Sequence, residues 1–321
     1  MDIAIVGAGM AGLSCADSLV AAGHRVTLFD KGRGPGGRMS SRRAETPLGQ
    51  CRFDHGAPSF SPRNGPFQAA VDAWMSAGAV ALWQGRFVSI NSDGVERPAS
   101  DAPRYVGTPA MNSIVRHLAD RHAVAWARRV SSISGAAGNL TLSFEDGAGE
   151  GPFSAVVVAI PAEQAGDFLE TCAPAFAADA RAVASAPCWA VMAAFNEPLA
   201  KPYDAARFET GPLHWAGRNA SKPGRSAEET WVLHATADWS QAHIDDDAGA
   251  VADTLLENFA PSEPPVFAAA HRWRFSQVIN AAGTTAAWDE SRGIGVCGDW
   301  LCGNQIEDAW TSGRALAALI G

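Results

Sequence analysis

The hydrophobic pattern at the start of the chain changes twice within its first 30 residues. A short apolar run over residues 3–6 is typical of a buried strand, and a second β-type run follows over 25–29. The segment between them is predicted to form a helix over about 11–22. A strand, a helix and a second strand in this order predict that an α/β domain begins at residue 2.

Further along the chain, similar patterns predict the other elements of a mixed fold. Apolar residues at helical spacing indicate a helix near 111–118, with Thr108 as its cap and Pro109 at its first position. An amphipathic helix is expected over 248–259, and a last helix opens at a capping box in residues 304–307 and runs to about 319. Strands are expected over 123–133, 140–144, 155–160, 190–195 and 231–235.

The glycines between the first strand and helix have the spacing G-x-G-x-x-G. Gly7 permits the tight turn, Gly9 lets the backbone approach a pyrophosphate, and Gly12 lets the helix pack against the strand. The first N–H groups of the helix, at its positive dipole end, would hold the phosphates. Asp30 follows the second strand, where its carboxylate can accept both hydroxyls of a ribose. The chain is therefore predicted to bind a dinucleotide.

Three later segments add further candidate contacts for the same ligand. Residues 31–41 contain a glycine pair followed by Arg38, whose guanidinium can bind a pyrophosphate with fork geometry. Residues 53–57 offer a tight backbone passage, and a short strand near 295–297 runs into Gly298 and Asp299.

Together these segments resemble the FAD-binding domain of the flavin amine oxidase superfamily. The resemblance implies that Asp299 holds the ribityl chain and that Val130 contacts adenine through its backbone. It also implies that the last helix points its N-terminus at the flavin N1–C2=O edge, where a reduced flavin carries negative charge. We expect non-covalent FAD, bound by Gly7, Gly9, Met10, Ala11, Gly12, Asp30, Lys31, Gly37, Arg38, Met39, His55, Gly56, Ala57, Pro58, Ser59, Val130, Gly298, Asp299, Ile306 and Glu307.

Within that superfamily the chain resembles renalase and its bacterial relatives. Where that family often has Gln-Tyr after the Gly-Ala pair, this chain has Pro58 and Ser59. Backbone contacts at these positions carry over, whereas a side-chain role of the aromatic residue does not. The matching blocks extend over nearly the whole chain and are 7–38, 53–57, 105–111, 215–219, 221–225, 271–278 and 298–300.

The expected fold class is α/β, with a Rossmann-type FAD-binding domain and a discontinuous second α+β substrate domain, as in the amine oxidases. Residues 1–57, 105–163 and 285–321 are assigned to the FAD-binding domain. Residues 58–104 and 164–284 would fold together as a substrate domain that covers the flavin, because dinucleotide sites of this kind lie at domain interfaces. The Pro- and Gly-rich segment 217–226 is expected to be an exposed loop.

The charge balance excludes some partners. A net charge of −9 and a pI of about 5.3 argue against binding to nucleic acid or to an acidic membrane. The sequence contains no stretch of about 18 uninterrupted apolar residues, so no membrane-spanning helix is expected. Three aspartates at 245–247 directly precede the helix at 248–259, so we interpret them as charges on its first turn and expect no metal site. The oligomeric state stays open.

The six cysteines show neither metal-binding spacing nor a disulfide framework. This is typical of a reducing cytoplasm, which is where we expect the protein. Cys302 follows the Gly-Asp-Trp turn, so a covalent flavin thioether is one alternative there, and we favour a buried free thiol.

The residues available do not predict an amine-binding site. Amine oxidation usually uses two aromatic side chains that flank the amine, and a lysine near the flavin N5. Tyr105 and Tyr203, the only two tyrosines, lie outside the C-terminal segment that would supply one of these side chains. Of the lysines, Lys31 belongs to the cofactor loop and Lys222 to the segment expected to be exposed, and the third is Lys201.

The renalase resemblance implies a different substrate, the 2- and 6-dihydro isomers of NAD(P)H, which are oxidised to NAD(P)⁺ while O₂ is reduced to H₂O₂. Losing hydride restores an aromatic pyridinium, so the reaction needs no base, only a flat ring held against the flavin N5. Eleven tryptophans can supply flat apolar walls. Candidate pocket residues are Trp300, Trp215, His234 and Trp273, and candidate phosphate contacts near the mouth are Arg218, Arg225 and Arg274.

Two alternative functions stay open. A pocket walled by tryptophan would also accept a small amine, so a flavin-dependent amine oxidase is the second hypothesis. The third is a flavin-binding protein without catalytic activity, whose FAD senses redox state. The dihydro isomer, the preference for NAD or NADP and the electron acceptor are likewise undetermined by the sequence.

Overall fold

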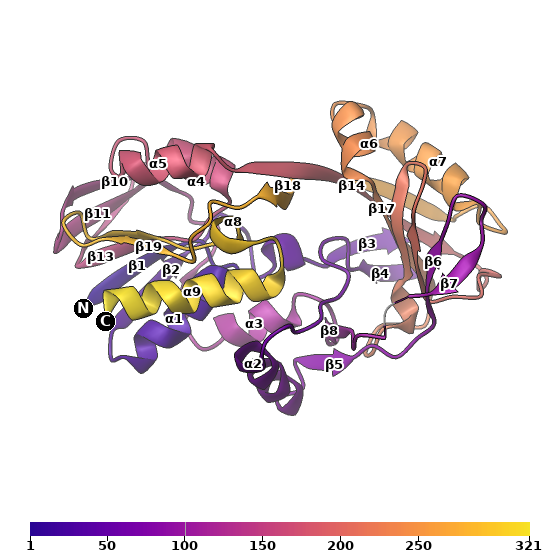
Figure 1. Cartoon of the computed structure of the whole chain (residues 1–321), viewed down its shortest axis with the longest axis horizontal. Coiled ribbons are helices and arrows are strands. Elements are labelled where there is room, and N and C mark those ends of the chain that lie inside the picture. Colours follow the sequence, from indigo (N-terminus) through magenta and orange to yellow (C-terminus); the bar gives the residue numbers. More distant parts are fainter. Residues whose placement is uncertain (100) are drawn as a thin grey trace.

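The computed structural model describes residues 1–99 and 101–321, and Figure 1 shows them as two lobes side by side. The first lobe contains a six-stranded sheet in the order β19-β20-β13-β1-β2-β9. β1 lies parallel to β2 and β13, with Ile3 opposite Val26 and Ala155, and β19 joins one edge antiparallel to β20. The strands are β1 (Asp2–Val6), β2 (Arg25–Phe29), β9 (Ala123–Ala125), β13 (Ala155–Val158), β19 (Ala287–Asp289) and β20 (Ile294–Val296).

Alternate side chains of β1 enter two different cores, one on each face of the sheet. Ile3 and Ile5 belong to one core, and Ala4 and Val6 belong to the other. The first core is covered by α1 (Met10–Ala21), α2 (Gly65–Ser76), α3 (Ser113–Ala119) and α9 (Ile306–Ile320). The second is covered by α4 (Ala162–Phe168), α5 (Pro174–Arg181) and a three-stranded sheet of β10 (Val130–Ala136), β11 (Asn139–Phe144) and β12 (Gly149–Phe153). Burial on both faces is typical of a parallel sheet.

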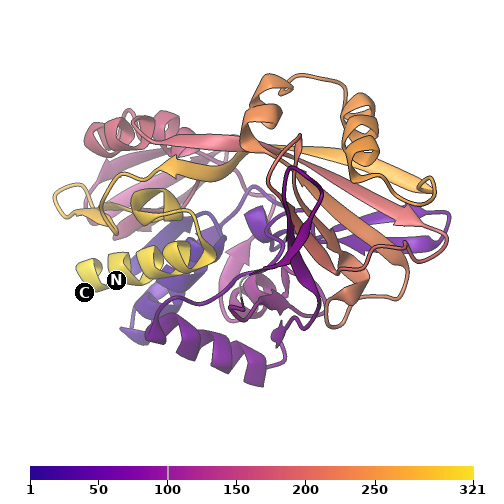
Figure 2. The same ribbon diagram turned by 45° about the vertical axis from the view of Figure 1, so that its right-hand side comes forward.

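The second lobe is built on a seven-stranded sheet in the order β18-β14-β17-β16-β15-β6-β7. Val191 and Ala193 of β14 face a core shared with α7, while Met192 and Ala194 face the β3–β4 hairpin. Figure 2 shows α6 and α7 at the outer side of this lobe. The elements are β3 (Arg42–Thr46), β4 (Gly49–Phe53), β6 (Phe87–Ile90), β7 (Glu96–Pro98), β14 (Ala184–Phe195), β15 (Ala205–Phe208), β16 (Leu213–Arg218), β17 (Glu229–Ala235), α6 (Ala237–Ala242), α7 (Ala248–Phe259) and β18 (Phe267–Asn280).

Short elements pack in the two cores of the first lobe. β5 (Val80–Leu82) pairs with β8 (Tyr105–Gly107), and α8 (Asp299–Cys302) follows β20. Single 3₁₀ turns occur at Gly37–Met39 and Asn219–Ser221.

The structure confirms the predicted βαβ start and corrects three later boundaries. Residues 123–133 form parts of two strands, because β9 pairs with β2 whereas β10 pairs with β11. The third helix begins at Ser113, so Thr108 and Pro109 lie outside it. The last helix is capped one position later than predicted, by Gln305 with Asp308 in a reciprocal capping box.

The two large sheets are built from the sequence ranges that we assigned to the two domains, but the β3–β4 hairpin, which we assigned to the FAD-binding domain, packs in the second lobe, and some helices also depart from the assignment. The six-stranded sheet comes from 1–57, 105–163 and 285–321, and the seven-stranded sheet comes from the other two ranges. α2 and α5, which we assigned to the substrate domain, pack in the two cores of the first lobe. They cover faces of the parallel sheet that would otherwise be exposed.

The close packing of α1 on α9 gives a test of the fold. A Cβ at Gly313 of α9 would lie 2.1 Å from the carbonyl oxygen of Ala11 in α1. We expect Gly313→Ala to lower the free energy of unfolding by about 1–3 kcal/mol, because the helices must move apart. Ala318→Leu, at an exposed position of the same helix, should change it by less than about 0.5 kcal/mol. Urea denaturation measures both variants, and equal effects would contradict this packing.

Candidate cofactor and substrate site

The glycine turn after β1 has the geometry that a dinucleotide requires. Gly7 has a φ of +106°, and a Cβ there would lie 2.4 Å from the carbonyl oxygen of Ala159. A Cβ at Gly12 would lie 2.0 Å from the carbonyl oxygen of Gly7, so only glycine allows α1 to pack so closely on the turn. A Cβ at Gly9, by contrast, would meet nothing within 4 Å. Open space therefore lies at the amino end of α1, where a pyrophosphate would bind.

Asp30 is fixed beside this turn by two backbone N–H groups. Ala8 donates to one carboxylate oxygen at 2.8 Å and Gly32 to the other at 2.6 Å. Each oxygen keeps a further lone pair for a ribose hydroxyl. Lys31 turns aside, because its Nζ donates to Oε1 of Gln164 at 2.7 Å. Val130 opens β10 with its side chain buried.

The other three predicted cofactor segments meet at Arg38. Its Nη2 lies 2.6 Å from Oδ1 of the buried Asp299, the first residue of α8. Its carbonyl oxygen accepts from the N–H of Ala57 at 2.9 Å, and a Cβ at Gly56 would lie 2.2 Å from that oxygen. Segments that lie far apart in the sequence thus converge at the carboxyl end of β1, where the glycine turn lies. These residues fit a dinucleotide cofactor.

The side chain of Glu307, in the first turn of α9, is already engaged by other protein groups. It is buried and accepts from the N–H of Arg63 at 2.6 Å and from Nδ2 of Asn64 at 2.5 Å. Ile306, the first residue of α9, is half-buried, as are Pro58 and Ser59. Met10, Ala11 and Met39 are buried.

Three of the four predicted pocket residues gather around His55. Its carbonyl oxygen accepts from Nε1 of Trp273 at 2.9 Å and from Nε2 of His234 at 3.2 Å. Trp215 stacks on His234 with ring centroids 5.5 Å apart. We call His55, Trp215, His234, His271 and Trp273 the aromatic cluster. His271 was not predicted, although it shares a strand with Trp273 at the alternate-residue spacing that puts both side chains on one face.

The fourth predicted pocket residue, Trp300, lies in the core. Its side chain is buried in the second core of the first lobe, and its Nε1 donates to the carbonyl oxygen of Ile160 at 3.1 Å. A Cβ at Gly298 would lie 2.5 Å from Cδ1 of the indole, so the ring folds back over this glycine. The prediction that Trp300 lines the pocket, which relied on its position next to Asp299 in the sequence, is therefore wrong.

His55 and His234 of the aromatic cluster are neutral at physiological pH, and burial lowers the pKa of His271 as well. Burial, together with the charges of His271 and His234, lowers the pKa of His55 to about 3. Burial is also the main cause that lowers the pKa of His234 to about 4. Because His234 donates through Nε2 to a carbonyl oxygen, its proton lies on that nitrogen.

A buried ionic cluster lies directly behind the aromatic cluster and was not predicted. The carboxylate of Asp54 accepts from Ser41 Oγ at 2.5 Å, Arg225 Nη2 at 2.5 Å, Lys222 Nζ at 3.2 Å and the N–H of Met111 at 3.0 Å. The side chains of Asp54, Lys222 and Arg225, which we call the Asp54 cluster, are no more than 2% exposed. The segment 217–226 was therefore wrongly predicted to be an exposed loop.

The charges in the Asp54 cluster do not balance. Two cations surround one carboxylate, which leaves one net positive charge buried. Burial acts to raise the pKa of Asp54, but the charges of Lys222 and Arg225 hold it far below its usual range. Burial lowers the pKa of Lys222 to about 8 despite the nearby carboxylate. The Lys222 ammonium also lies 5.2 Å from the ring of Trp83 and 5.9 Å from that of Trp215.

The other predicted phosphate contacts are engaged within the second lobe. Arg218 lies 3.2 Å from Glu229, and Arg274 lies 3.2 Å from Asp245. Asp247 caps α7, as the interpretation of the three aspartates requires. Among the described residues no group of three possible ligands could hold a metal ion, and all six cysteines are free.

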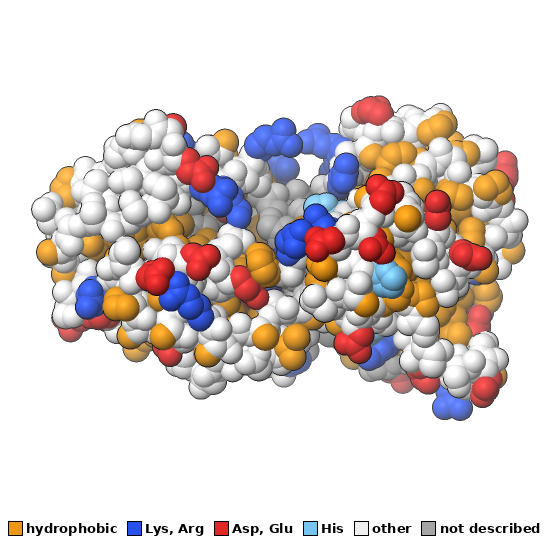
Figure 3. All heavy atoms as spheres, turned by 90° about the horizontal axis from the view of Figure 1, so that it is seen from above, with side chains coloured by type: hydrophobic (Ala, Val, Ile, Leu, Met, Phe, Trp, Pro, Cys, Tyr) orange, Lys and Arg blue, Asp and Glu red, His pale blue; other side chains and the backbone are white. Residues whose placement is uncertain are grey.

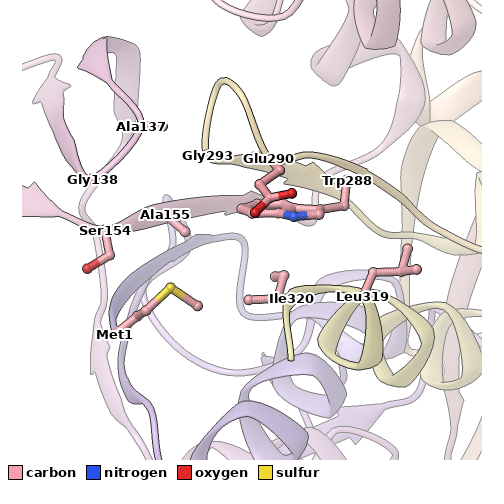
Figure 4. A pocket seen from close by; sticks show the side chains of 10 residues that line it. All are labelled: Met1, Ala137, Gly138, Ser154, Ala155, Trp288, Glu290, Gly293, Leu319 and Ile320. Atoms are coloured by element: carbon pink, nitrogen blue, oxygen red, sulfur yellow. The ribbon is translucent and has the colours of Figure 1, made fainter.

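A separate cavity of about 350 Å³ lies at the amino ends of β1 and β13 in the six-stranded sheet. Figure 4 shows it lined by Met1, Ala155, Trp288 and the last turn of α9. β1 and β13 begin there, whereas the glycine turn follows the other end of β1, so this cavity is separate from the cofactor region. Figure 3 shows the surface hollowed between the two lobes, with Lys and Arg side chains on the rim.

Comparisons with known proteins agree with this geometry. Residues 5–74 match the NAD(P)-binding Rossmann-like domain, and residues 74–321 match the flavin containing amine oxidoreductases. The chain therefore belongs to the flavin containing amine oxidoreductase family. It is a flavin-dependent oxidoreductase, and its cofactor is FAD. Among the described residues, the helices are too short or too polar to cross a membrane.

Solved structures share the fold over nearly the entire chain at low sequence identity. A putrescine oxidase with bound putrescine is 13% identical with a TM-score of 0.68, covering 99% of this chain and 98% of that one. An oxidoreductase from Methanosarcina mazei is 13% identical with a TM-score of 0.72, covering 99% and 100%. The 4,4'-diapophytoene desaturase (4,4'-diaponeurosporene-forming) of Staphylococcus haemolyticus (strain JCSC1435) is 58% identical over 40 residues, which span 12% of this chain and 8% of that curated relative.

The open space at Gly9 gives a test of the cofactor position. We expect Gly9→Ala to leave the melting temperature of the apoprotein unchanged, since the new Cβ meets no protein atom within 4 Å. FAD affinity should fall by about tenfold or more, because the methyl group occupies the space that the pyrophosphate needs. Gly12→Ala should instead destabilise the apoprotein. Calorimetry and FAD titration measure both effects, and unchanged FAD binding in Gly9→Ala would place the cofactor elsewhere.

The Asp54 cluster gives a test of its own. Asp54→Asn keeps the shape of the side chain but leaves two buried cations without a counter-charge, so we expect a loss of about 3–5 kcal/mol in the free energy of unfolding. Asp245→Asn is the matched control, since its carboxylate is 77% exposed and pairs with two arginines at the surface. The control should lose less than about 1 kcal/mol. Similar denaturation midpoints for the two variants would rule out a structural role of the cluster.

Proposed function

We propose that the protein oxidises the 2- and 6-dihydro isomers of NAD(P)H to NAD(P)⁺ with O₂ as the electron acceptor. In the balanced reaction the dihydronicotinamide loses a hydride, and O₂ gains that hydride and one solvent proton to become H₂O₂. The chemistry supplied by bound FAD is hydride acceptance at N5 and electron transfer to O₂. FAD is non-covalent in this proposal, since burial raises the pKa of the Cys302 thiol to about 11.

The aromatic cluster is the observation that carries this proposal. It joins two indoles and three imidazoles within one group, and both His55 and His234 are neutral above about pH 5. A dihydronicotinamide needs a flat contact that holds one ring carbon near the acceptor, and it needs no base. Flat side chains without charge meet both requirements.

Sequence blocks that resemble renalase supply all residues of the two clusters except His234. Trp215 belongs to the block 215–219, and His271 and Trp273 belong to the block 271–278. The block 221–225 contributes Lys222 and Arg225 to the Asp54 cluster. The blocks therefore include most residues of the aromatic cluster and all three residues of the Asp54 cluster.

Oxidation of a small amine is the second candidate, favoured by the family name and by the putrescine bound in one similar structure. The buried charges argue against it. An amine is protonated at neutral pH and would approach the net positive charge of the Asp54 cluster, a repulsion that is strong in a poorly solvated site. A neutral dihydronicotinamide ring meets no such repulsion. A redox sensor, the third candidate, would show no rapid reduction by any of these donors.

The substrate proposal predicts which donors bleach the flavin. Under argon, the 2- or 6-dihydro isomer should reduce the holoenzyme within seconds, and ordinary 4-dihydro NADH at least about 10²-fold more slowly, because one ring pose offers only one carbon to N5. Stopped-flow absorbance of the flavin measures these rates, with putrescine and other small amines as comparison donors. An amine that acts faster than both isomers would establish the second candidate instead.

The proposal also predicts a flat pH profile for the rate of flavin reduction between pH 6 and 9. His55 and His234 lose their protons below this range, with pKa values of about 3 and 4, and no side chain must remove a proton from the substrate. Lys222 is the buried group that titrates within the range, with a pKa of about 8. A rate step near pH 8 that disappears in Lys222→Met would show that this charge acts on the chemistry, contrary to the proposal.

A further inference from the structure

The β3–β4 hairpin lies across β18 at the aromatic cluster. Phe53, the last residue of β4, stacks on Phe267 of β18 with ring centroids 5.7 Å apart. Two residues further on, the ring of His55 lies 4.9 Å from that of His271 and 5.1 Å from that of Trp273. The hairpin and its continuation thus follow one face of β18, on which Phe267, His271 and Trp273 alternate.

Arg42 is placed beside this row by the register of the hairpin. It is the cross-strand partner of Phe53, and directly opposed residues of an antiparallel pair carry their side chains on the same face. Arg42 therefore lies on the face that Phe53 turns toward β18. The next residue, Arg43, pairs with Arg52 on the opposite face of the hairpin. Arg42 also lowers the pKa of both His55 and His271, as a cation close to them would.

Among the described residues, the charge of Arg42 is not engaged, and neither are those of Arg43 and Arg52 in the same hairpin, but of these three only Arg42 lies on the face that is turned toward β18. Other arginines near the site are paired. Arg38 pairs with Asp299, Arg225 with Asp54, and Arg272 with Asp245. Within residues 1–99 and 101–321, no hydrogen bond or ion pair joins the Arg42 guanidinium to another group. The side chain is exposed, so an incoming anion can reach it. The chain as a whole is negatively charged, with a net charge of −9. A cation without a partner beside the aromatic cluster is therefore a local site of positive charge.

We propose that Arg42 is a substrate-binding residue that binds a phosphate of the dinucleotide while the aromatic cluster holds its nicotinamide ring. This inference rests on the proposed function for the identity of the anion. The planar guanidinium can donate two parallel hydrogen bonds to a phosphate, a geometry that a lysine cannot reproduce. The substrate is then recognised at two points, a neutral ring at the cluster and an anionic tail at Arg42.

The first experiment tests the anion site without relying on catalysis. Inorganic pyrophosphate is titrated into the FAD-loaded enzyme by calorimetry for the wild type, Arg42→Ala and Arg43→Ala. Arg43 is the matched control, since it is adjacent, exposed and on the opposite face of the hairpin. We expect Arg42→Ala to weaken pyrophosphate binding by about tenfold, as for the loss of one charge-assisted contact, and Arg43→Ala to change it less than about twofold. Equal effects of the two variants would overturn the proposal.

The second experiment asks whether this anion belongs to the substrate. Flavin reduction is followed with the 2- or 6-dihydro dinucleotide and with the corresponding dihydronicotinamide riboside, which has no phosphate. Arg42→Ala should raise the half-saturating concentration of the dinucleotide about tenfold, leave the limiting rate unchanged and leave the riboside unaffected. A variant that loses pyrophosphate binding but keeps the wild-type response to the dinucleotide would overturn the assignment of Arg42 to the substrate.

The two experiments separate failure of this inference from failure of the proposed function. If none of the dihydronicotinamides reduces the flavin, the proposed function is wrong, and Arg42 is then not a contact of that substrate even if it binds pyrophosphate. If they reduce the flavin and Arg42→Ala behaves as Arg43→Ala does, the proposed function stands and the role of Arg42 is wrong.

Discussion

The buried carboxylate of Asp54 is the interaction on which the rest of the site depends. It receives hydrogen bonds from Ser41, Met111, Lys222 and Arg225, which come from three separate stretches of the chain. Arg225 also donates to the carbonyl oxygen of Gly107 at the end of β8, so the cluster ties the second lobe to the first. Burying three charges is costly unless they satisfy one another, so these segments hold the arrangement that pairs them. The next residues, His55 to Ala57, carry both the aromatic cluster and the predicted flavin contacts.

In residues 54–57 the side chain of Asp54 and the backbone of the residues that follow have different roles. The side chain of Asp54 is occupied by structure, while the carbonyl oxygen of His55 orients His234 and Trp273 and the N–H of Ala57 binds the carbonyl oxygen of Arg38. Arg38 in turn reaches Asp299 at the start of α8. A continuous set of hydrogen bonds thus runs from the second lobe through residues 54–57 to the cofactor edge of the first sheet. Positioning of this kind is what a flavin enzyme adds to the chemistry of its cofactor.

The sequence predicted those parts of the fold that local contacts decide. Gly7, Gly9, Gly12 and Asp30 lie within one βαβ unit, where the spacing along the chain determines the geometry. The Asp54 cluster could not be predicted in this way, since Asp54 and Lys222 are 168 residues apart. A segment that contains Gly, Ser and Pro together with three basic residues is expected to be exposed unless the counter-charge of those residues is known. The prediction that Trp300 lines the pocket was wrong for a related reason. Its neighbour Asp299 contacts Arg38 at the cofactor site, while the indole of Trp300 packs in the core.

The electrostatics of the two clusters together favour one kind of substrate. His55 and His234 of the aromatic cluster are uncharged at neutral pH, and the Asp54 cluster behind them carries one surplus positive charge. A donor that enters as a cation is opposed by that charge throughout its approach. A donor with a neutral ring and an anionic tail is not opposed, and its oxidation creates a positive charge on the ring at the moment the product must leave. Under the proposed function, the buried surplus charge would act after the chemical step, because it repels the positively charged pyridinium product and promotes its release.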